Sequence, residues 1–214
     1  MKLTYEEYAA ILRNDFPSFI ERSFYELNPQ TQLKWAPYIE VIATGLEACR
    51  RGEANRHILC VGPRSLKSHC VSIAFPAWYL GHHPSTKIIC ASYGQELADT
   101  FAKDCRKIMM SDWYQRIFRT RLADRAVSDF TTTDQGGRLS TSVGGALIGR
   151  GADLFIIDDP LKPEEAFSET QRKAANRWYD DTVVGRLNDK ANSRIIITMQ
   201  RLHQDDLVGH VLKK

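Results

Sequence analysis

The chain has 214 residues, of which 43% are hydrophobic, 26% charged and 10% aromatic, a composition typical of a folded globular protein rather than a disordered or fibrous one. Its 29 Lys and Arg residues exceed its 26 Asp and Glu residues by only three, so any contact with nucleic acid has to be local rather than driven by global charge. No apolar run approaches the roughly 18 residues of a membrane helix, and Glu6, Glu7 and Asp15 interrupt the stretch that a signal peptide needs. The five cysteines include no C-x-x-C pair, which argues against a disulfide framework or a common zinc site. We therefore expect an intracellular protein without a membrane segment.

The first residues predict helices. Tyr5, Tyr8, Leu12 and Phe16 fall on one helical face within residues 3–27, and Pro17 is expected to restart the helix after a break near residue 15. After the turn-rich residues 27–35, helical spacing resumes over 38–49. We expect an N-terminal helical arm over residues 1–30 and one main domain over residues 31–214.

From residue 57 onward, short apolar runs alternate with longer amphipathic stretches. The runs are HILCV, KIICAS, LFIID and RIIIT, and their alternation with helices is typical of a mainly parallel sheet in an α/β fold. Helices are expected over 68–80, with a kink at Pro76, over 97–109 and over 168–187. Residues 126–151 predict a β-hairpin and a glycine-rich loop before the LFIID strand.

The segment GPRSLKS lies between the first predicted strand and a predicted helix, the context of a phosphate-binding loop. There Lys67, expected to be solvent-accessible, would reach the β and γ phosphates, and Ser68 would ligate Mg²⁺. The usual pattern has glycine where this chain has Leu66 and Val61, and we expect the Leu66 side chain to crowd the phosphates. By itself the segment could equally be an ordinary strand-to-helix turn. The expected nucleotide-binding loop comprises Gly62, Pro63, Arg64, Ser65, Leu66, Lys67 and Ser68.

Two adjacent carboxylates end the apolar run in DLFIIDDP, which resembles a Walker B strand. Asp158 would hold the Mg²⁺ shell, and Asp159 would orient and polarise the water that attacks the γ-phosphate. A pair of aspartates alone would more simply be a solvated acidic turn. Because the pair follows a Lys-Ser loop in the right order, we favour the functional interpretation.

Longer segments resemble the large subunit of phage terminases. PRSLKS, ASYGQELA, GALIGRGADLFIIDDPLKPEEAFSETQR and IIITMQRLHQDDLVGHVL occur in the order found in that family, and the resemblance covers residues from about 28 to 212. The usual TRWH-type ending of the family is MQRLH here. The resemblance implies the N-terminal packaging ATPase of that family: a P-loop NTPase of the ASCE type, α/β, with a mainly parallel central sheet flanked by helices and an N-terminal helical arm.

The resemblance also implies roles for residues outside the loop. Gln32 and Tyr38, with Trp35 between them, lie where the family recognises adenine, although helix packing is an equally good explanation for each. Thr198 and Gln200, at the end of the RIIIT strand, resemble the motif that senses the γ-phosphate and couples hydrolysis to movement. SYGQ, at 92–95, could contact DNA or simply end a strand.

Charge on the transferred phosphoryl group calls for an arginine. Arg64 lies in the loop and could act in its own subunit, Arg186 could be offered to a neighbouring subunit, and Arg150 is a third candidate; each could also be an ordinary solvated side chain. A basic cluster interleaved with Trp113, Tyr114 and Phe118 could face DNA or form a solvated helical face. This cluster comprises Arg116, Arg119, Arg121 and Arg125.

The expected reaction is Mg²⁺-dependent hydrolysis of ATP that drives double-stranded DNA into a procapsid in the host cell cytoplasm. The resemblance implies a homo-oligomeric ring on a portal protein, a small terminase subunit as partner, and a C-terminal nuclease domain that this chain lacks. A helicase-like DNA-remodelling ATPase shares the same motifs. The departure at Leu66 leaves a third alternative, a nucleotide-binding assembly module that does not hydrolyse ATP.

Overall fold

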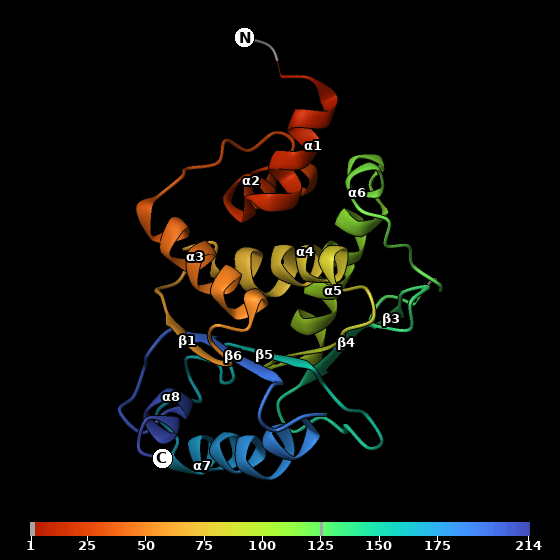
Figure 1. Ribbon diagram of the computed structural model, residues 1–214. Coiled ribbons are helices and arrows are strands. Elements are labelled where there is room, and N and C mark those ends of the chain that lie inside the picture. The colour runs from red at the N-terminus through yellow and green to blue at the C-terminus, as the bar shows by residue number, and fades with distance from the viewer. Residues whose placement is uncertain (1–2, 125) are drawn as a thin grey trace.

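The computed structural model describes residues 3–124 and 126–214, beginning with two helices joined by a sharp break (Figure 1). Helix α1 (Tyr5–Asn14) starts with a capping box between Thr4 and Glu7, and α2 (Phe16–Leu27) follows directly. Asp15 ends α1 and caps α2 by accepting a hydrogen bond from the backbone of Ser18, while Pro17 occupies the first turn of α2. The predicted break at residue 15 is therefore confirmed.

A six-stranded sheet forms the centre of the molecule, in the order β1-β6-β5-β2-β4-β3. All neighbouring strands are parallel except β3 and β4, which form the predicted hairpin; β4 also pairs in parallel with β2, which the sequence did not indicate. The mainly parallel α/β sheet is thus confirmed. Its strands are β1 (Arg56–Cys60), β2 (Lys87–Ser92), β3 (Asp129–Thr131), β4 (Gly137–Ser142), β5 (Leu154–Asp158) and β6 (Arg194–Met199).

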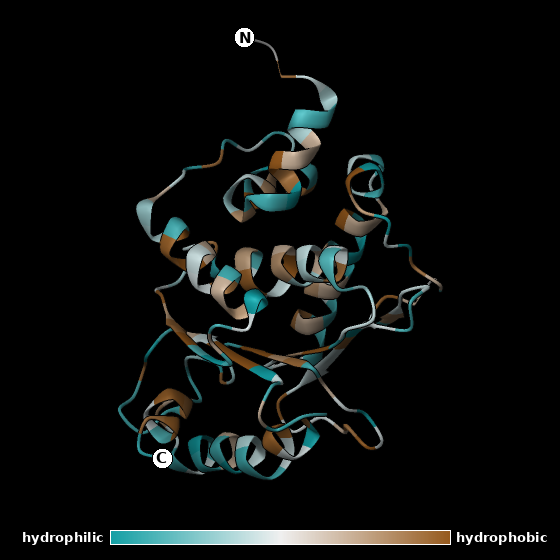
Figure 2. Cartoon of the chain, viewed as in Figure 1, coloured by the Kyte–Doolittle hydropathy of each residue, from teal (hydrophilic) through white to brown (hydrophobic). Residues whose placement is uncertain are grey.

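Helices cover both faces of the sheet because successive strand residues point to opposite sides. Leu154 and Ile156 of β5 enter a large core with the N-terminal helices, whereas Phe155 and Ile157 enter a second core with the C-terminal helices. In Figure 1, α3 to α5 lie over one face, with α1, α2 and α6 beyond them, and α7 and α8 lie over the other. Hydrophobic residues dominate the central strands (Figure 2). The further helices are α3 (Pro37–Arg51), α4 (Phe75–His82), α5 (Gln95–Met110), α6 (Asp112–Ile117), α7 (Glu169–Trp178) and α8 (Leu207–Val211).

Two predicted helices are not uniform. The helix expected over 68–80 contains a π-helical segment, η1 (His69–Ala74), and Pro76 lies in the first turn of the α4 segment that follows. The helix expected over 168–187 is α-helical as far as Trp178. It then continues as π-helix η2 (Tyr179–Val183) and 3₁₀-helix η3 (Val184–Arg186).

Among the described residues, no helix combines the length and apolar character needed to cross a bilayer.

Candidate active site

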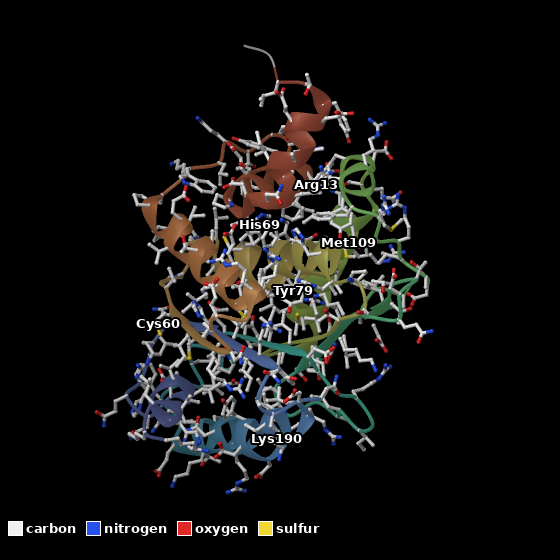
Figure 3. The ribbon with its side chains drawn as sticks, viewed as in Figure 1. Arg13, Cys60, His69, Tyr79, Met109 and Lys190 are labelled. Carbon is white, nitrogen blue, oxygen red and sulfur yellow. The ribbon has the colours of Figure 1, made fainter. Side chains whose placement is uncertain are left out.

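The loop after β1 has an unusual backbone. Figure 3 labels Cys60, at the end of β1, and His69, at the start of η1; the loop lies between them. Arg64 and Leu66 adopt left-handed conformations, with φ of 56° and 58°, such as occur in anion-binding turns. Leu66 packs against the larger core instead of standing free above the loop, so its side chain does not crowd the loop as expected. The left-handed conformation explains why glycine would suit this position.

Lys67 and Asp159 form an ion pair across the site. Lys67 Nζ lies 2.7 Å from Asp159 Oδ2, and the lysine is only 8% exposed, so the expectation of a solvent-accessible Lys67 is wrong. Asp159 has a φ of 46°, and its Oδ1 accepts a hydrogen bond from the backbone N–H of Gln200 at 3.1 Å. Its own amide donates to the Thr198 carbonyl at 2.9 Å. Asp159 is therefore fixed between the loop and the end of β6.

Asp158 is a buried carboxylate with one oxygen left over. It is 1% exposed, and its Oδ2 accepts a hydrogen bond from the Ser72 hydroxyl at 2.7 Å. Within the described part of the chain, Oδ1 has no hydrogen-bond partner. Burial raises the pKa of this carboxyl to about 6; the Ser72 hydrogen bond opposes the shift and the charge of Asp159 adds to it. A bound cation would offset the cost of ionising this group.

Thr198 lies beside Asp158 because β5 and β6 pair in register at these two residues. Thr198 is completely buried, and its Oγ1 has no partner among the described residues. Ser92 of β2 pairs with Asp158 on the other side. Three polar residues on adjacent strands thus face η1 at the carboxyl edge of the sheet, where ligands of open α/β sheets bind.

A cavity of about 330 Å³ opens at this edge. Lys67, Ser68, Asp159 and Gln200 line it, together with Tyr93 from the segment after β2. Proline, leucine and phenylalanine side chains form much of the remaining wall. The cavity therefore combines a lysine, carboxylates and uncharged polar groups with an apolar surface.

The residues present fit a Mg²⁺ ion held jointly with phosphate. Outside residues 1–2 and 125, no group of three His, Cys, Asp or Glu side chains is placed to hold a metal ion, so the chain has no all-protein cage there. Mg²⁺ commonly needs only one or two protein carboxylates, with phosphates and waters as the other ligands. The free Oδ1 of Asp158 and the hydroxyl of Ser68 are suitable oxygen ligands.

Gln32 and Tyr38 are not brought to this cavity. Both side chains are exposed, and Tyr38 lies in the first turn of α3. Between them, Trp35 donates its indole N–H to Glu40 at 3.0 Å. Gln32 and Tyr38 do not line the cavity that contains Lys67.

The three candidate arginines lie in different places. Arg64 is exposed in the loop itself. Arg150 forms an ion pair with Asp129, and the Arg186 carbonyl accepts a hydrogen bond from the Ala152 amide at 2.8 Å. Ala152 precedes β5, and the length of that strand puts it about 20 Å from Asp158. Arg150 and Arg186 are therefore at the edge of the sheet opposite the cavity.

The aromatic residues of the basic cluster belong to the core. Tyr114 and Phe118 are buried, and Trp113 donates to Glu26 at 3.0 Å beneath the Arg22 guanidinium. Arg116 and Arg119 are exposed, and Arg121 donates to three backbone carbonyls. Arg125 lies outside the described residues. Tyr114 and Phe118 thus serve packing, while Trp113 is partly buried against the same core.

Two residues line the cavity although the motifs predicted no role for them there. Tyr93 lines the cavity and donates its backbone N–H to Asp159 at 3.0 Å. Asp206, which also lines the cavity, caps α8 and forms a 2.8 Å ion pair with Arg201. Both residues lie in segments that carry the resemblance, but only the tertiary structure shows that they line the same cavity as Lys67.

Comparisons with known proteins bear on the fold. The architecture defines an α/β protein with a mainly parallel sheet and a polar site at its carboxyl edge. No protein-family model matches the chain, and no curated protein matches it by sequence. Among solved structures it is similar to the crystal structure of the HK97 bacteriophage large terminase, with a TM-score of 0.58 and 16% sequence identity. The match covers 92% of this chain but only 40% of the terminase chain. The chain therefore has a terminase-like fold.

Proposed function

We propose that this chain is the ATPase motor domain of a viral DNA-packaging terminase, a P-loop NTPase of the ASCE type that hydrolyses ATP with Mg²⁺. The observation that carries the proposal is the 2.7 Å contact between Lys67 and Asp159. It brings the phosphate-loop lysine and the second aspartate of the DDP motif to one cavity, although they are far apart in the sequence. The terminase-like fold independently supports the same class of protein.

The chain's own residues divide the work of hydrolysis. Lys67 would leave Asp159 for the β and γ phosphates, and Asp159 Oδ2 would then be free to orient and polarise the attacking water. Ser68 and Asp158 would hold Mg²⁺, which when bound neutralises phosphate charge. Gln200, whose backbone N–H donates to Asp159, would move with this carboxylate and so transmit the change to the end of β6.

The partners follow from the proposed class. Double-stranded DNA is the moved substrate, and a homo-oligomeric ring on a portal protein, with a small terminase subunit, is the working assembly in the host cell cytoplasm. Because Arg150 and Arg186 lie at the opposite edge of the sheet, Arg64 is the candidate for a charge supplied within the subunit. Arg186 could act only on a neighbour's site.

One observation favours a second candidate, a nucleotide-binding assembly module without hydrolysis. The same ion pair neutralises both Lys67 and Asp159, so a site that kept it while nucleotide was bound through the other groups of the loop would not activate water. Binding of a fluorescent ATP analogue and phosphate release should be measured on the same samples, with Lys67→Ala as control. Turnover that matches occupancy supports the ATPase, and binding without turnover supports the assembly module.

DNA assays separate the motor from a helicase-like enzyme. Hydrolysis by a packaging motor should be stimulated by blunt double-stranded DNA without separating its strands. A forked duplex with a fluorophore and a quencher on opposite strands reports separation directly. ATP-dependent fluorescence gain would assign the chain to the helicase-like class instead.

A further inference from the structure

A fully buried arginine lies beneath the proposed metal site. Arg138, on β4, is 1% exposed. Its Nη1 donates to the Ser140 hydroxyl at 2.6 Å, and its Nη2 donates to the Ser72 carbonyl at 3.3 Å. In residues 3–124 and 126–214, no carboxylate lies within ion-pair distance of this guanidinium. Burying an unpaired charge costs free energy, so an apolar side chain at this position would be expected to stabilise the fold more than arginine.

Ser72 connects this arginine to Asp158. While the Ser72 carbonyl accepts from Arg138, its hydroxyl donates to Asp158 Oδ2. Ser72 lies in the π-helical segment η1 and is itself 1% exposed. One residue therefore receives the guanidinium with its backbone and holds the carboxylate with its side chain. The contact fixes Oδ2 and leaves Oδ1, which has no described partner, available.

The strand between Arg138 and Asp158 places both charges near one thiol. Cys90 of β2 lies between β4 and β5, and burial raises the pKa of its thiol. The positive charge of Arg138 opposes that rise, and the negative charge of Asp158 adds to it. Both ionic groups thus act within the same buried space, where charges are screened less than at the surface.

We propose that Arg138 is a positioning residue for the metal site: through Ser72 it holds Asp158 so that the free Oδ1 is presented to Mg²⁺. The inference rests on the proposed function, in which Asp158 is the Mg²⁺ ligand. Arg138 does not touch the metal or the nucleotide. It acts through the backbone of η1, by donating to the Ser72 carbonyl while the Ser72 hydroxyl holds Asp158 Oδ2.

The test measures metal binding separately from nucleotide binding. Mn²⁺, used as a paramagnetic probe for the Mg²⁺ site, is titrated into protein saturated with a non-hydrolysable ATP analogue, and free Mn²⁺ is followed by electron paramagnetic resonance. Nucleotide affinity is measured in parallel with EDTA present. The variants are Arg138→Met, Arg138→Lys and Ser72→Ala. Arg194→Met is the matched control, because Arg194 donates to the Cys49 carbonyl at the opposite end of β6.

Arg138→Met should weaken Mn²⁺ binding about 10- to 100-fold, as expected for the loss of a group that orients a metal ligand. Nucleotide affinity in EDTA should stay at the wild-type value. The Mn²⁺ affinity of Arg138→Lys should lie between those of the wild type and Arg138→Met, because lysine keeps the charge but lacks the forked donor. Arg194→Met should bind Mn²⁺ normally. An unchanged Mn²⁺ affinity in Arg138→Met would overturn the inference, as would an equal loss of nucleotide affinity in EDTA.

The double variant tests the route through Ser72. If Arg138 acts through this serine, Arg138→Met should cost less in the Ser72→Ala background than in the wild type. Additive losses would overturn that route. If Arg138→Met does not fold, the proposal is tested with Ser72→Ala and Arg138→Lys. Wild-type Mn²⁺ affinity in both of these variants would overturn it. A wild-type protein without metal-dependent nucleotide binding would instead overturn the proposed function, and this inference with it.

Discussion

Lys67 Nζ lies 2.7 Å from Asp159 Oδ2, and this ion pair joins the loop after β1 to the end of β5. The Asp159 carboxylate also accepts from the backbone N–H of Gln200, directly after β6, and the Asp159 backbone N–H donates to the Thr198 carbonyl. The loop, the DDP motif and the end of β6 are therefore connected through Asp159. A group that attracts Lys67 away from Asp159 would therefore change the contacts of Asp159 at the end of β6.

Replacing Lys67 by methionine should destabilise the fold more than a surface substitution. The lysine is nearly buried and its partner is 30% exposed, so the loss should be about 1–2 kcal/mol, between the values for exposed and buried pairs. Lys173→Met is the control, because the Lys173 pair with Glu169 is mostly exposed and should change stability by less than about 0.5 kcal/mol. Urea denaturation measures both. Equal effects would show that the Lys67 pair contributes no more than a surface pair.

Leu66 is strained by its backbone but packed by its side chain. Leu66→Ala and Leu66→Gly both remove the packing, whereas only glycine relieves the left-handed φ of 58°. The glycine variant should therefore be more stable than the alanine variant by about 1 kcal/mol. Denaturation midpoints of the two variants measure this difference directly. Alanine at least as stable as glycine would contradict the left-handed conformation of this residue.

The buried Asp158 makes stability depend on pH. Because its pKa is raised from 3.8 to about 6, the folded protein binds a proton more tightly than the unfolded chain, and stability falls as pH rises through this window. The free energy of unfolding should be measured from pH 4 to 7 for wild type and Asp158→Asn. The wild type should lose stability relative to the variant, and a constant difference would contradict the shift.

Under the proposed function, Arg186 lies too far from the cavity of its own chain to act there, so we expect it to contribute only to the site of a neighbouring subunit. Arg186→Ala and Asp159→Asn proteins should each be inactive on a portal, while mixed rings should recover some phosphate release at sites that combine an intact Arg186 with an intact Asp159. An arginine of this kind contributes about 10³ to 10⁵ in rate. Isolated wild-type monomers should accordingly be slow. If confirmed mixed rings show no recovery, or if Arg186→Ala monomers are fully active, the role passes to Arg64.

The sheet was predictable because its strands carry strong local signals. The runs KIICAS and LFIID coincide with β2 and β5, since continuous apolar residues flanked by helices suit a strand buried on both faces. The break at Asp15 was likewise predictable, because capping and proline act within a few residues. These features depend on the neighbouring sequence alone.

The missed features depend on tertiary structure. Nothing near Arg138 in the sequence indicates that it reaches Ser72, because β4 joins the sheet beside β2 through strand pairing distant in the sequence. The burial of Lys67 arises from its pairing with Asp159. Arg186 was considered for the site from its motif alone, yet the bridge between Ala152 and Leu187 holds it at the opposite edge. The motifs indicate which functional groups the chain carries, but their contacts depend on the tertiary structure.

The proposal that Asp159 activates water at this site is tested most directly by single-turnover hydrolysis with Asp159→Asn. Asparagine tolerates the left-handed φ of 46° and keeps the side-chain shape, but it lacks the charge that polarises water. With protein in excess over radiolabelled ATP, we expect the wild type to release phosphate only when Mg²⁺ is present, and the variant to retain bound ATP without releasing phosphate. Phosphate release by the variant at the wild-type rate would contradict the assignment, and so would a wild type that binds ATP and Mg²⁺ but never releases phosphate.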